Sequence, residues 1–130
     1  MDFEFSFSNG EQLALAKVAG RPTLGQFMSL IDVMGSDSHE WKHNRLLVDL
    51  TGVQTLTSFT DQFAIGEKAA RVLSHLHVAS VVLPHRITRV SEKAANRGGA
   101  HVHVFTDEAE ARAWLEATTG TPSLQPLTGG

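Results

Sequence analysis

The chain has 130 residues, 42% of them hydrophobic and 19% charged, a composition typical of one folded domain and not of a disordered one. Its formal net charge is −3 and its basic residues are scattered, so it lacks the concentrated positive stripe of a nucleic-acid-binding protein. There is no cysteine, which excludes disulfides, thiolate metal ligands and thiol nucleophiles. No apolar run approaches the roughly 20 residues that span a bilayer, and the first residues lack a signal-peptide pattern. We therefore expect a cytoplasmic protein without a membrane span.

The first predicted element is a β-hairpin. Phenylalanine alternates with polar residues over residues 3–7, which is the period of a strand with one buried face. The pair Asn9-Gly10 favours a two-residue type I′ turn, because both central residues of that turn need positive φ. A second strand over about 12–19 would then run back, with Phe5 opposite Ala14. The sequence thus predicts a hairpin at one edge of a sheet.

A helix follows the hairpin. Thr23 and Gln26 have the spacing of a capping box, and apolar residues recur after them at helical intervals. We expect Gly35 to end this helix as a C′ glycine. The polar segment after it contains one large apolar residue, Trp41, which should hold the segment against the body of the domain.

Three strand–helix units complete the chain. The predicted strands cover about 46–50, 78–83 and 101–105, and the predicted helices cover about 58–76, about 89–97 and the segment that Thr106 caps. Strands that alternate with helices imply right-handed crossovers between parallel strands. The sequence therefore predicts an α/β fold with a five-stranded mixed sheet: the hairpin, then three parallel strands with crossover helices. One domain would cover residues 1–118, and residues 119–130, rich in Gly, Thr, Pro and Ser, would form a mobile tail.

Two stretches resemble segments of a known family. LLVDLTGVQTLTSFTD, residues 46–61, and VFTDEAEARAWL, residues 104–115, are similar to parts of the STAS/SpoIIAA-like group, the fold of anti-sigma factor antagonists, and the second resembles its uncharacterised SpoIIAA-like branch. The resemblance covers about residues 3–115 and implies a regulatory domain. In the antagonists the phosphorylated serine is the second of a "DSSG" motif, which falls here on residues 57–60. Phe59 occupies that position without a hydroxyl, so the resemblance implies a departure from classical partner switching, with Ser58 and Thr60 as flanking hydroxyls.

Six of the seven histidines form three pairs in the sequence: His39 with His43, His75 with His77, and His101 with His103. A zinc site needs three or four ligands in a fixed geometry. These pairs belong to different predicted elements, and the chain has neither cysteine nor an HExxH motif. We therefore expect no bound metal and no cofactor.

The sequence also favours a protein that is not an enzyme. There is no G-x-S-x-G nucleophile elbow and no glycine-rich phosphate loop. Asp49 lies in a predicted buried strand, where its carboxylate is more simply explained by capping the amides of the next loop than by acid–base catalysis.

One set of residues could still bind a partner or a ligand. Ligands of parallel sheets bind beyond the carboxyl ends of the strands, where helix N-termini converge. The residues predicted at that edge are Thr55, Thr57, Ser58, Thr60, His85, Arg86 and Arg89. Helix amides, hydroxyls and arginines suit an anion, although the hydroxyls also serve as ordinary N-caps.

These observations lead to one functional hypothesis and one alternative. The hypothesis is a non-enzymatic regulatory or binding module that acts through a protein partner or a small anionic or lipid-like ligand. Exposed apolar residues such as Leu13, Leu15 and Trp41 further suggest a homodimer. The alternative is a small enzyme with its site at the same edge of the sheet.

Overall fold

The computed structural model describes residues 2–118, and the tail predicted over residues 119–130 lies outside the described residues. Within residues 2–118 the chain forms one five-stranded sheet in the order β1-β2-β3-β4-β5, with β1 antiparallel to β2 and the other pairs parallel. The strands are β1 (Phe3–Asn9), β2 (Ala14–Gly20), β3 (Arg45–Val53), β4 (His77–Val81) and β5 (His101–Phe105). The helices are α1 (Leu24–Asp37), α2 (Phe59–Val72), α3 (Val90–Arg97) and α4 (Glu108–Ala117), with short 3₁₀ turns η1 (Ser38–Glu40) and η2 (Pro84–Arg86). The predicted α/β fold and mixed sheet are confirmed.

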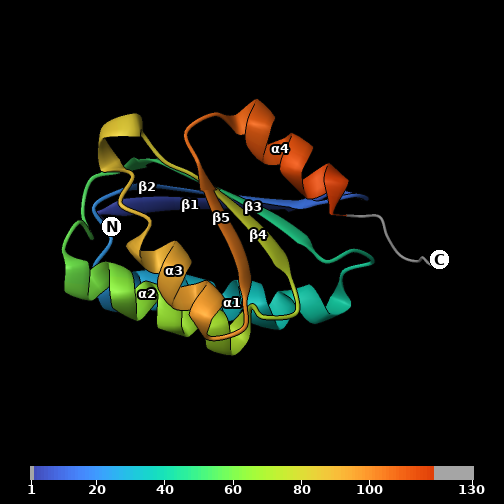
Figure 1. The fold of residues 1–130 in the computed structure, drawn as a ribbon, viewed down its shortest axis with the longest axis horizontal. Helices are drawn as coiled ribbons and strands as arrows, with labels where there is room; N and C mark the ends of the chain where they lie inside the picture. The colour runs from blue at the N-terminus through green and yellow to red at the C-terminus, as the bar shows by residue number, and fades with distance from the viewer. Residues whose placement is uncertain (1, 119–130) are drawn as a thin grey trace.

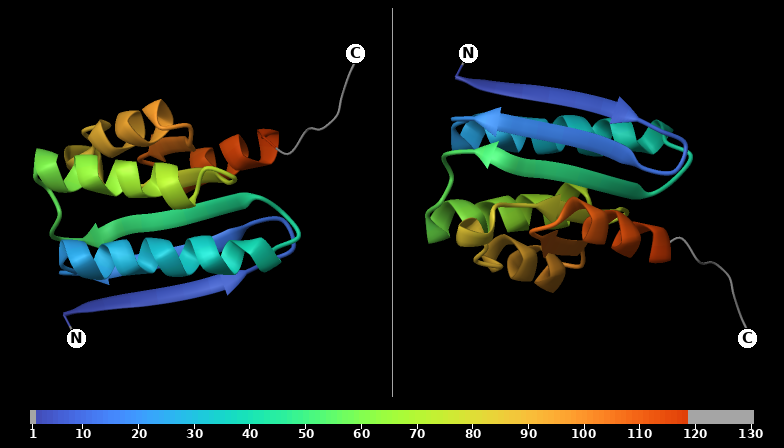
Figure 2. Two further views of the ribbon diagram at one scale, coloured as in Figure 1. Left: turned by 90° about the horizontal axis from the view of Figure 1, so that it is seen from below. Right: turned by 90° about the horizontal axis from the view of Figure 1, so that it is seen from above.

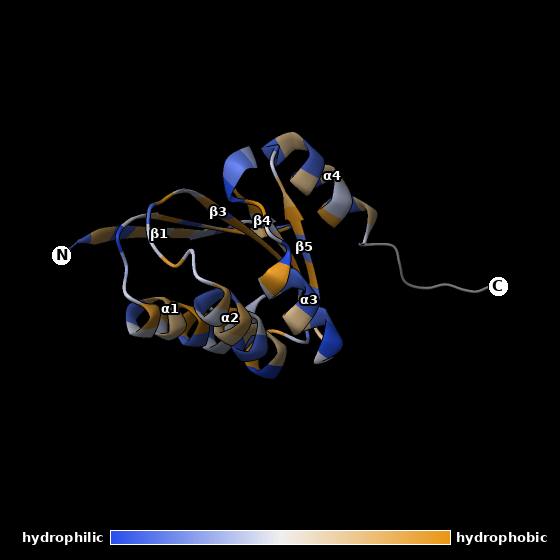
Figure 3. Cartoon of the chain, turned by 60° about the vertical axis from the view of Figure 1, so that its left-hand side comes forward, coloured by the Kyte–Doolittle hydropathy of each residue, from blue (hydrophilic) through white to orange (hydrophobic). Residues whose placement is uncertain are grey.

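The helices divide unequally between the two faces of the sheet. The helices α1, α2 and α3 cover one face, and α4 alone covers the other (Figure 1). On its face α4 packs against β3, β4 and β5 and leaves β1 and β2 uncovered (Figure 2). Coloured by hydropathy, the central strands are mostly hydrophobic, and each helix mixes hydrophobic with hydrophilic residues, as expected for helices with one buried side (Figure 3). Among the described residues, none of the helices has the length and apolar character that crossing a membrane requires.

The hairpin is present, but its turn differs from the prediction. Phe5 pairs with Val18 and not with Ala14, and residues 10–13 form the connection, in which Gly10 N–H donates to the Leu13 carbonyl at 3.0 Å. Gly10 does not adopt the positive φ that a type I′ turn requires. The register moves by an even number of residues, so the phenylalanines keep the predicted face of the sheet.

Trp41 holds its polar segment to the domain, as predicted. Its indole ring stacks on Phe7 with the ring centroids 5.7 Å apart, and its Nε1–H donates to Asp37 Oδ2 at 2.8 Å. The side chain is half-buried and packs against the core between the sheet and α1. The indole thus has both an apolar contact and a partner for its polar atom.

The predicted starts of α1 and α2 are confirmed. The Thr23 hydroxyl accepts from Gln26 N–H at 3.1 Å, and the Gln26 side chain accepts from Thr23 N–H at 2.9 Å, which completes the capping box. The Ser58 hydroxyl accepts from Asp61 N–H at 3.1 Å. These short side chains satisfy amides that the first turn of a helix leaves without partners.

Two predicted helix ends are wrong. Gly35 lies inside α1, where a Cβ atom would come within 2.9 Å of the Val72 carbonyl oxygen. The glycine therefore permits the close approach of α1 to the end of α2 and does not end the helix. Asp107, not Thr106, caps α4, and its carboxylate accepts from Glu110 N–H at 3.1 Å. An ionised carboxylate is favoured there by the helix dipole.

Candidate functional site

The hydroxyls that follow β3 are mostly used within the fold. Thr55 Oγ1 donates to the Pro22 carbonyl at 2.6 Å, and Ser58 caps α2. Thr57 and Thr60 are exposed. Thr55 and Ser58 therefore have structural roles, whereas Thr57 and Thr60 face solvent.

The structure joins the two predicted loops through one of the two arginines. An NH2 group of Arg86, in η2, donates to the Thr55 carbonyl at 2.8 Å, so the segments after β3 and β4 lie in contact. Arg89 points instead into the junction of α3 with β5, where it bonds Glu92. His85 is exposed in η2. The structure thus brings these two loops into contact through Arg86.

A cavity of about 110 Å³ lies beneath this edge, between the sheet and the helices α1, α2 and α3. Its inner wall is apolar and buried; it includes Phe27, Ile31, Met34, Val48, Val78 and Val102. Its more exposed lining is polar; it includes Thr55, Gln62, Arg86, Thr88 and Arg89. The cavity therefore joins an apolar interior to a cationic mouth at the carboxyl ends of the parallel strands, where such folds bind ligands.

This cavity is unusual for so small a domain. Protein interiors are packed at crystal-like density and contain few voids larger than a water molecule. A space of about 110 Å³ leaves the apolar side chains around it without contacts that a filled core would give them.

Backbone strain occurs at the same place. Leu56 has φ 66° and Arg89 has φ 61°, and among the described residues these are the non-glycine residues with positive φ. Both line the cavity. Such conformations cost about 1–3 kcal/mol each and cluster at ligand sites and switch regions. Void and strain therefore coincide in space.

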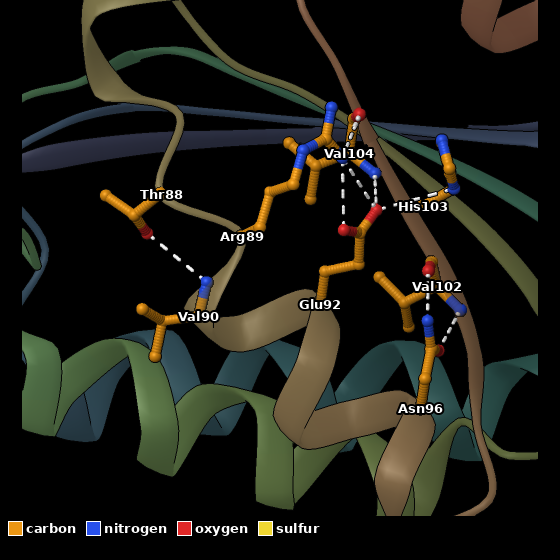
Figure 4. Close-up of polar contacts among 8 residues, drawn as sticks. All are labelled: Thr88, Arg89, Val90, Glu92, Asn96, Val102, His103 and Val104. Atoms are coloured by element: carbon orange, nitrogen blue, oxygen red, sulfur yellow. Dashed lines mark hydrogen bonds and ion pairs between the residues drawn. The ribbon is translucent and has the colours of Figure 1, made fainter.

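A polar network fixes α3 to the edge strand β5 at one side of the mouth (Figure 4). Arg89 NH1 lies 3.0 and 3.2 Å from the two carboxylate oxygens of Glu92. Glu92 is 7% exposed, and its Oε2 accepts from Val104 N–H at 2.8 Å and lies 3.4 Å from His103 Nδ1. The buried carboxylate thus has a cation and a backbone amide as partners, as a buried charge requires.

One turn further along α3, Asn96 repeats this pattern. Its Nδ2–H donates to the Val102 carbonyl at 2.8 Å, and its Oδ1 accepts from Val102 N–H at 2.7 Å (Figure 4). Arg89 NH1 also donates to the Val104 carbonyl at 3.4 Å. Side chains of α3 and its N-cap therefore satisfy the outward-facing backbone groups of β5.

Several of these residues are absent from the set predicted from the sequence. Ser80 is a hydroxyl residue in the apolar strand β4, and its side chain lines the cavity without a hydrogen bond among the described residues. A lone serine within His77–Val81 is the signal that could have drawn attention to it. Glu92 and Asn96 are spaced i, i+4, which places two polar side chains on one face of a helix. The positive φ of Leu56 has no signal in the sequence.

The histidines form stacked pairs. The ring centroids of His39 and His75 are 4.8 Å apart, and those of His77 and His101 are 5.1 Å apart. Burial, followed by the charge of His39, lowers the pKa of His75. Burial, His101 and Arg45 lower the pKa of His77. In the part of the chain that the structure describes, no three histidine or carboxylate side chains come together in a way that could hold a metal ion.

The closest serine–histidine pair does not have the geometry of an activated nucleophile. Ser38 is buried, its hydroxyl donates to the Gly35 carbonyl at 2.6 Å, and its Oγ lies 2.6 Å from His75 Nε2. The imidazole is therefore the donor, whereas a general base must accept the hydroxyl hydrogen. Asp49 accepts from the amide and the hydroxyl of Thr51 at 3.0 and 2.7 Å, the capping role predicted for it.

Comparison with known proteins agrees with this architecture. A family model described as SpoIIAA-like matches residues 15–116. The crystal structure of an anti-sigma factor antagonist from Mycobacterium paratuberculosis is similar, with a TM-score of 0.63 and 12% identity, over 88% of this chain and 94% of that one. An uncharacterised protein of the DUF3478 family with a SpoIIAA-like fold, from Shewanella loihica PV-4, aligns with a TM-score of 0.49 and 17% identity, over 87% and 93% of the two chains. Comparison with curated proteins gives no match.

Proposed function

This chain belongs to the SpoIIAA-like family, and we propose that it is a non-enzymatic regulatory module that acts by binding a small apolar or lipid-like molecule in the cavity beneath the edge formed by residues 55–60 and 85–89. The observation that carries the proposal is the cavity itself, about 110 Å³ with an apolar wall. An engineered apolar cavity of about 150 Å³ stays dry and binds benzene, so a void of this kind is a ready site for a small apolar group.

The strained residues support a binding role. A void and two left-handed non-glycine residues both lower the stability of the domain, and both occur around Leu56 and Arg89. A ligand that fills the void would recover contacts that the protein alone does not make. Binding would thus stabilise the protein, which is the property a ligand-responsive module needs.

A protein partner is a second candidate function, favoured by Phe59. This side chain is 69% exposed at the start of α2 and stacks on Phe63 with the ring centroids 6.0 Å apart. It occupies the phospho-acceptor position implied by the family resemblance, between Ser58 and Thr60. An exposed aromatic residue is a common anchor of protein interfaces. The similar anti-sigma factor antagonist makes a regulatory partner the natural candidate.

Two further predictions belong to this proposal. The cytoplasm remains the predicted location. A homodimer also remains a prediction, although its original motivation is weaker, because Leu13, Leu15 and Trp41 are half-buried against the two cores.

The cavity can be tested with neutral probes. Benzene and 1-pentanol, titrated into the protein, should shift the methyl resonances of Ile31, Ile65 and Val78 and raise the melting temperature. Ser80→Leu places an apolar side chain in the cavity and should abolish these shifts. Ser80→Ala removes the hydroxyl without filling the space and is the matched control that should keep them. Equal binding of the probes to Ser80→Leu and to the unmodified protein would contradict the proposal.

A further inference from the structure

We infer that the ligand of this cavity is a small monocarboxylic acid whose carboxylate binds Arg86 and whose apolar body enters the cavity. The inference rests on the proposed function and adds to it the chemical class of the ligand. It follows from the charges at the mouth, the hydrogen bonds that Arg86 leaves free, and the size of the void.

The charges at the mouth favour one negative charge. Arg86 and Arg89 are the charged residues that line the cavity in the described chain, and no carboxylate lines it. Arg89 is already paired with the buried Glu92. Arg86 has no acidic partner among the described residues, and its side chain donates instead to the Thr55 carbonyl. The mouth thus offers one uncompensated positive charge, which matches a carboxylate better than a doubly charged phosphate.

Arg86 also has the geometry for this role. A guanidinium carries five N–H donors in a planar fork, and one of those of Arg86 goes to Thr55. The remaining donors can bind a carboxylate in the bidentate manner that arginine favours. The bond to Thr55 fixes the guanidinium at the mouth in advance, so little side-chain freedom is lost when the ligand binds.

The size of the cavity limits the apolar body. Scaled from the cavity of about 150 Å³ that accepts benzene, a void of about 110 Å³ holds about four to five carbon atoms. Hexanoate, with five carbons beyond its carboxylate, matches this limit. Hexanamide has the same shape without the charge and is therefore the matched neutral probe.

The test compares the two probes on three variants by calorimetric titration at neutral pH. The unmodified protein should bind hexanoate at least about 10-fold more tightly than hexanamide, because a charge-assisted pair is worth more than a neutral hydrogen bond. Arg86→Gln should remove this preference and keep hexanamide binding, since it removes the charge and leaves the apolar wall of the cavity unchanged. Arg86→Lys should restore part of the preference. Arg71→Gln, at an exposed arginine of α2 that does not line the cavity, should leave it unchanged.

The outcomes distinguish failure of this inference from failure of the proposed function. If both probes bind but hexanoate has no advantage, the inference is overturned and the proposed function stands. A preference that survives in Arg86→Gln also overturns it, because the carboxylate then lies elsewhere. If neither hexanoate nor hexanamide binds, and benzene and 1-pentanol also fail, the inference and the proposed function fall together.

Discussion

The two faces of the sheet are built in different ways. Under α4, the side chains of Leu47, Ala79, Ala111 and Leu115 are all 0% exposed and form a small closed core. Under α1, α2 and α3, a larger core surrounds a cavity of about 110 Å³, and α3 is fixed to β5 by the buried carboxylate of Glu92 and the amide of Asn96. One face is filled and the other contains a void.

The neighbouring residues Ala79 and Ser80 of β4 show what the difference means. They point to opposite faces, because successive side chains of a strand alternate. Ala79 is 0% exposed against α4, whereas Ser80 lines the cavity. The closed face supplies stability that the open face loses through its void, so one strand serves both packing and binding.

The largest effect on stability is expected when Glu92, which fixes α3 to β5, is replaced. Glu92→Ala should reduce the free energy of unfolding by about 2–3 kcal/mol, because Arg89 and Val104 N–H lose their partner. The lower end of the range for buried ion pairs applies, since the Arg89 side chain is 44% exposed and can be rehydrated. Glu92→Gln retains an acceptor for Val104 N–H and should cost about 1 kcal/mol. Urea denaturation of both variants checks the order, and equal losses would show that the hydrogen bond to β5 is unimportant.

The next largest effect is expected when leucine is introduced at neighbouring positions that face opposite sides of the sheet. Ala79→Leu should destabilise the protein by about 1–3 kcal/mol, because its site is already filled. Ser80→Leu should stabilise it by up to about 1 kcal/mol, since the added carbons occupy the void. Thermal unfolding of the two variants measures the contrast directly. Similar losses for both would mean that the cavity wall cannot accept the larger side chain and that the two faces are equally closed.

The smallest effect is a pH dependence on the closed face. Burial, with His101 and Arg45, lowers the pKa of His77, so the folded state disfavours its protonated form. The unfolded state then binds more protons as pH falls below the ordinary histidine value of about 6.5, and stability falls with it until the folded pKa is reached. Above about 6.5 the group is neutral in both states and this loss is absent. His77→Gln should flatten the slope in that window, as measured by unfolding at a series of pH values, and an unchanged slope would assign the loss to other groups.

The sequence was sufficient for the order of elements because its signals are local. The alternation of phenylalanines in residues 3–7, the capping box at Thr23 and the cap at Ser58 each depend on a few neighbouring residues. The predicted turn after Asn9 and the predicted strand register were wrong because the register is decided by how both strands pack on the rest of the sheet. The helix end predicted at Gly35 was wrong because this glycine contacts Val72, which is distant in the sequence.

The candidate site, too, could be predicted only in part from the sequence. The contact of Arg86 with the loop after β3 agrees with the rule that the carboxyl ends of parallel strands meet at one edge, and a binding role for these residues stays a prediction. The cavity was not foreseen, since a void is the space that side chains from many separate elements leave between them. The contact of Arg89 with Glu92 was not foreseen either, because it depends on the position of β5 beside α3.

The side chains of α3 on β5 have a consequence for assembly. An unpaired edge strand is a template on which another chain can add a strand. The outward backbone groups of Val102 and Val104 are occupied by Asn96, Glu92 and Arg89, so β5 offers no such template. In the described chain β1 is then the one sheet edge open to pairing. Copies joined strand to strand through β1 would close as a pair and stop, because a sheet with a single open edge cannot grow into a fibril.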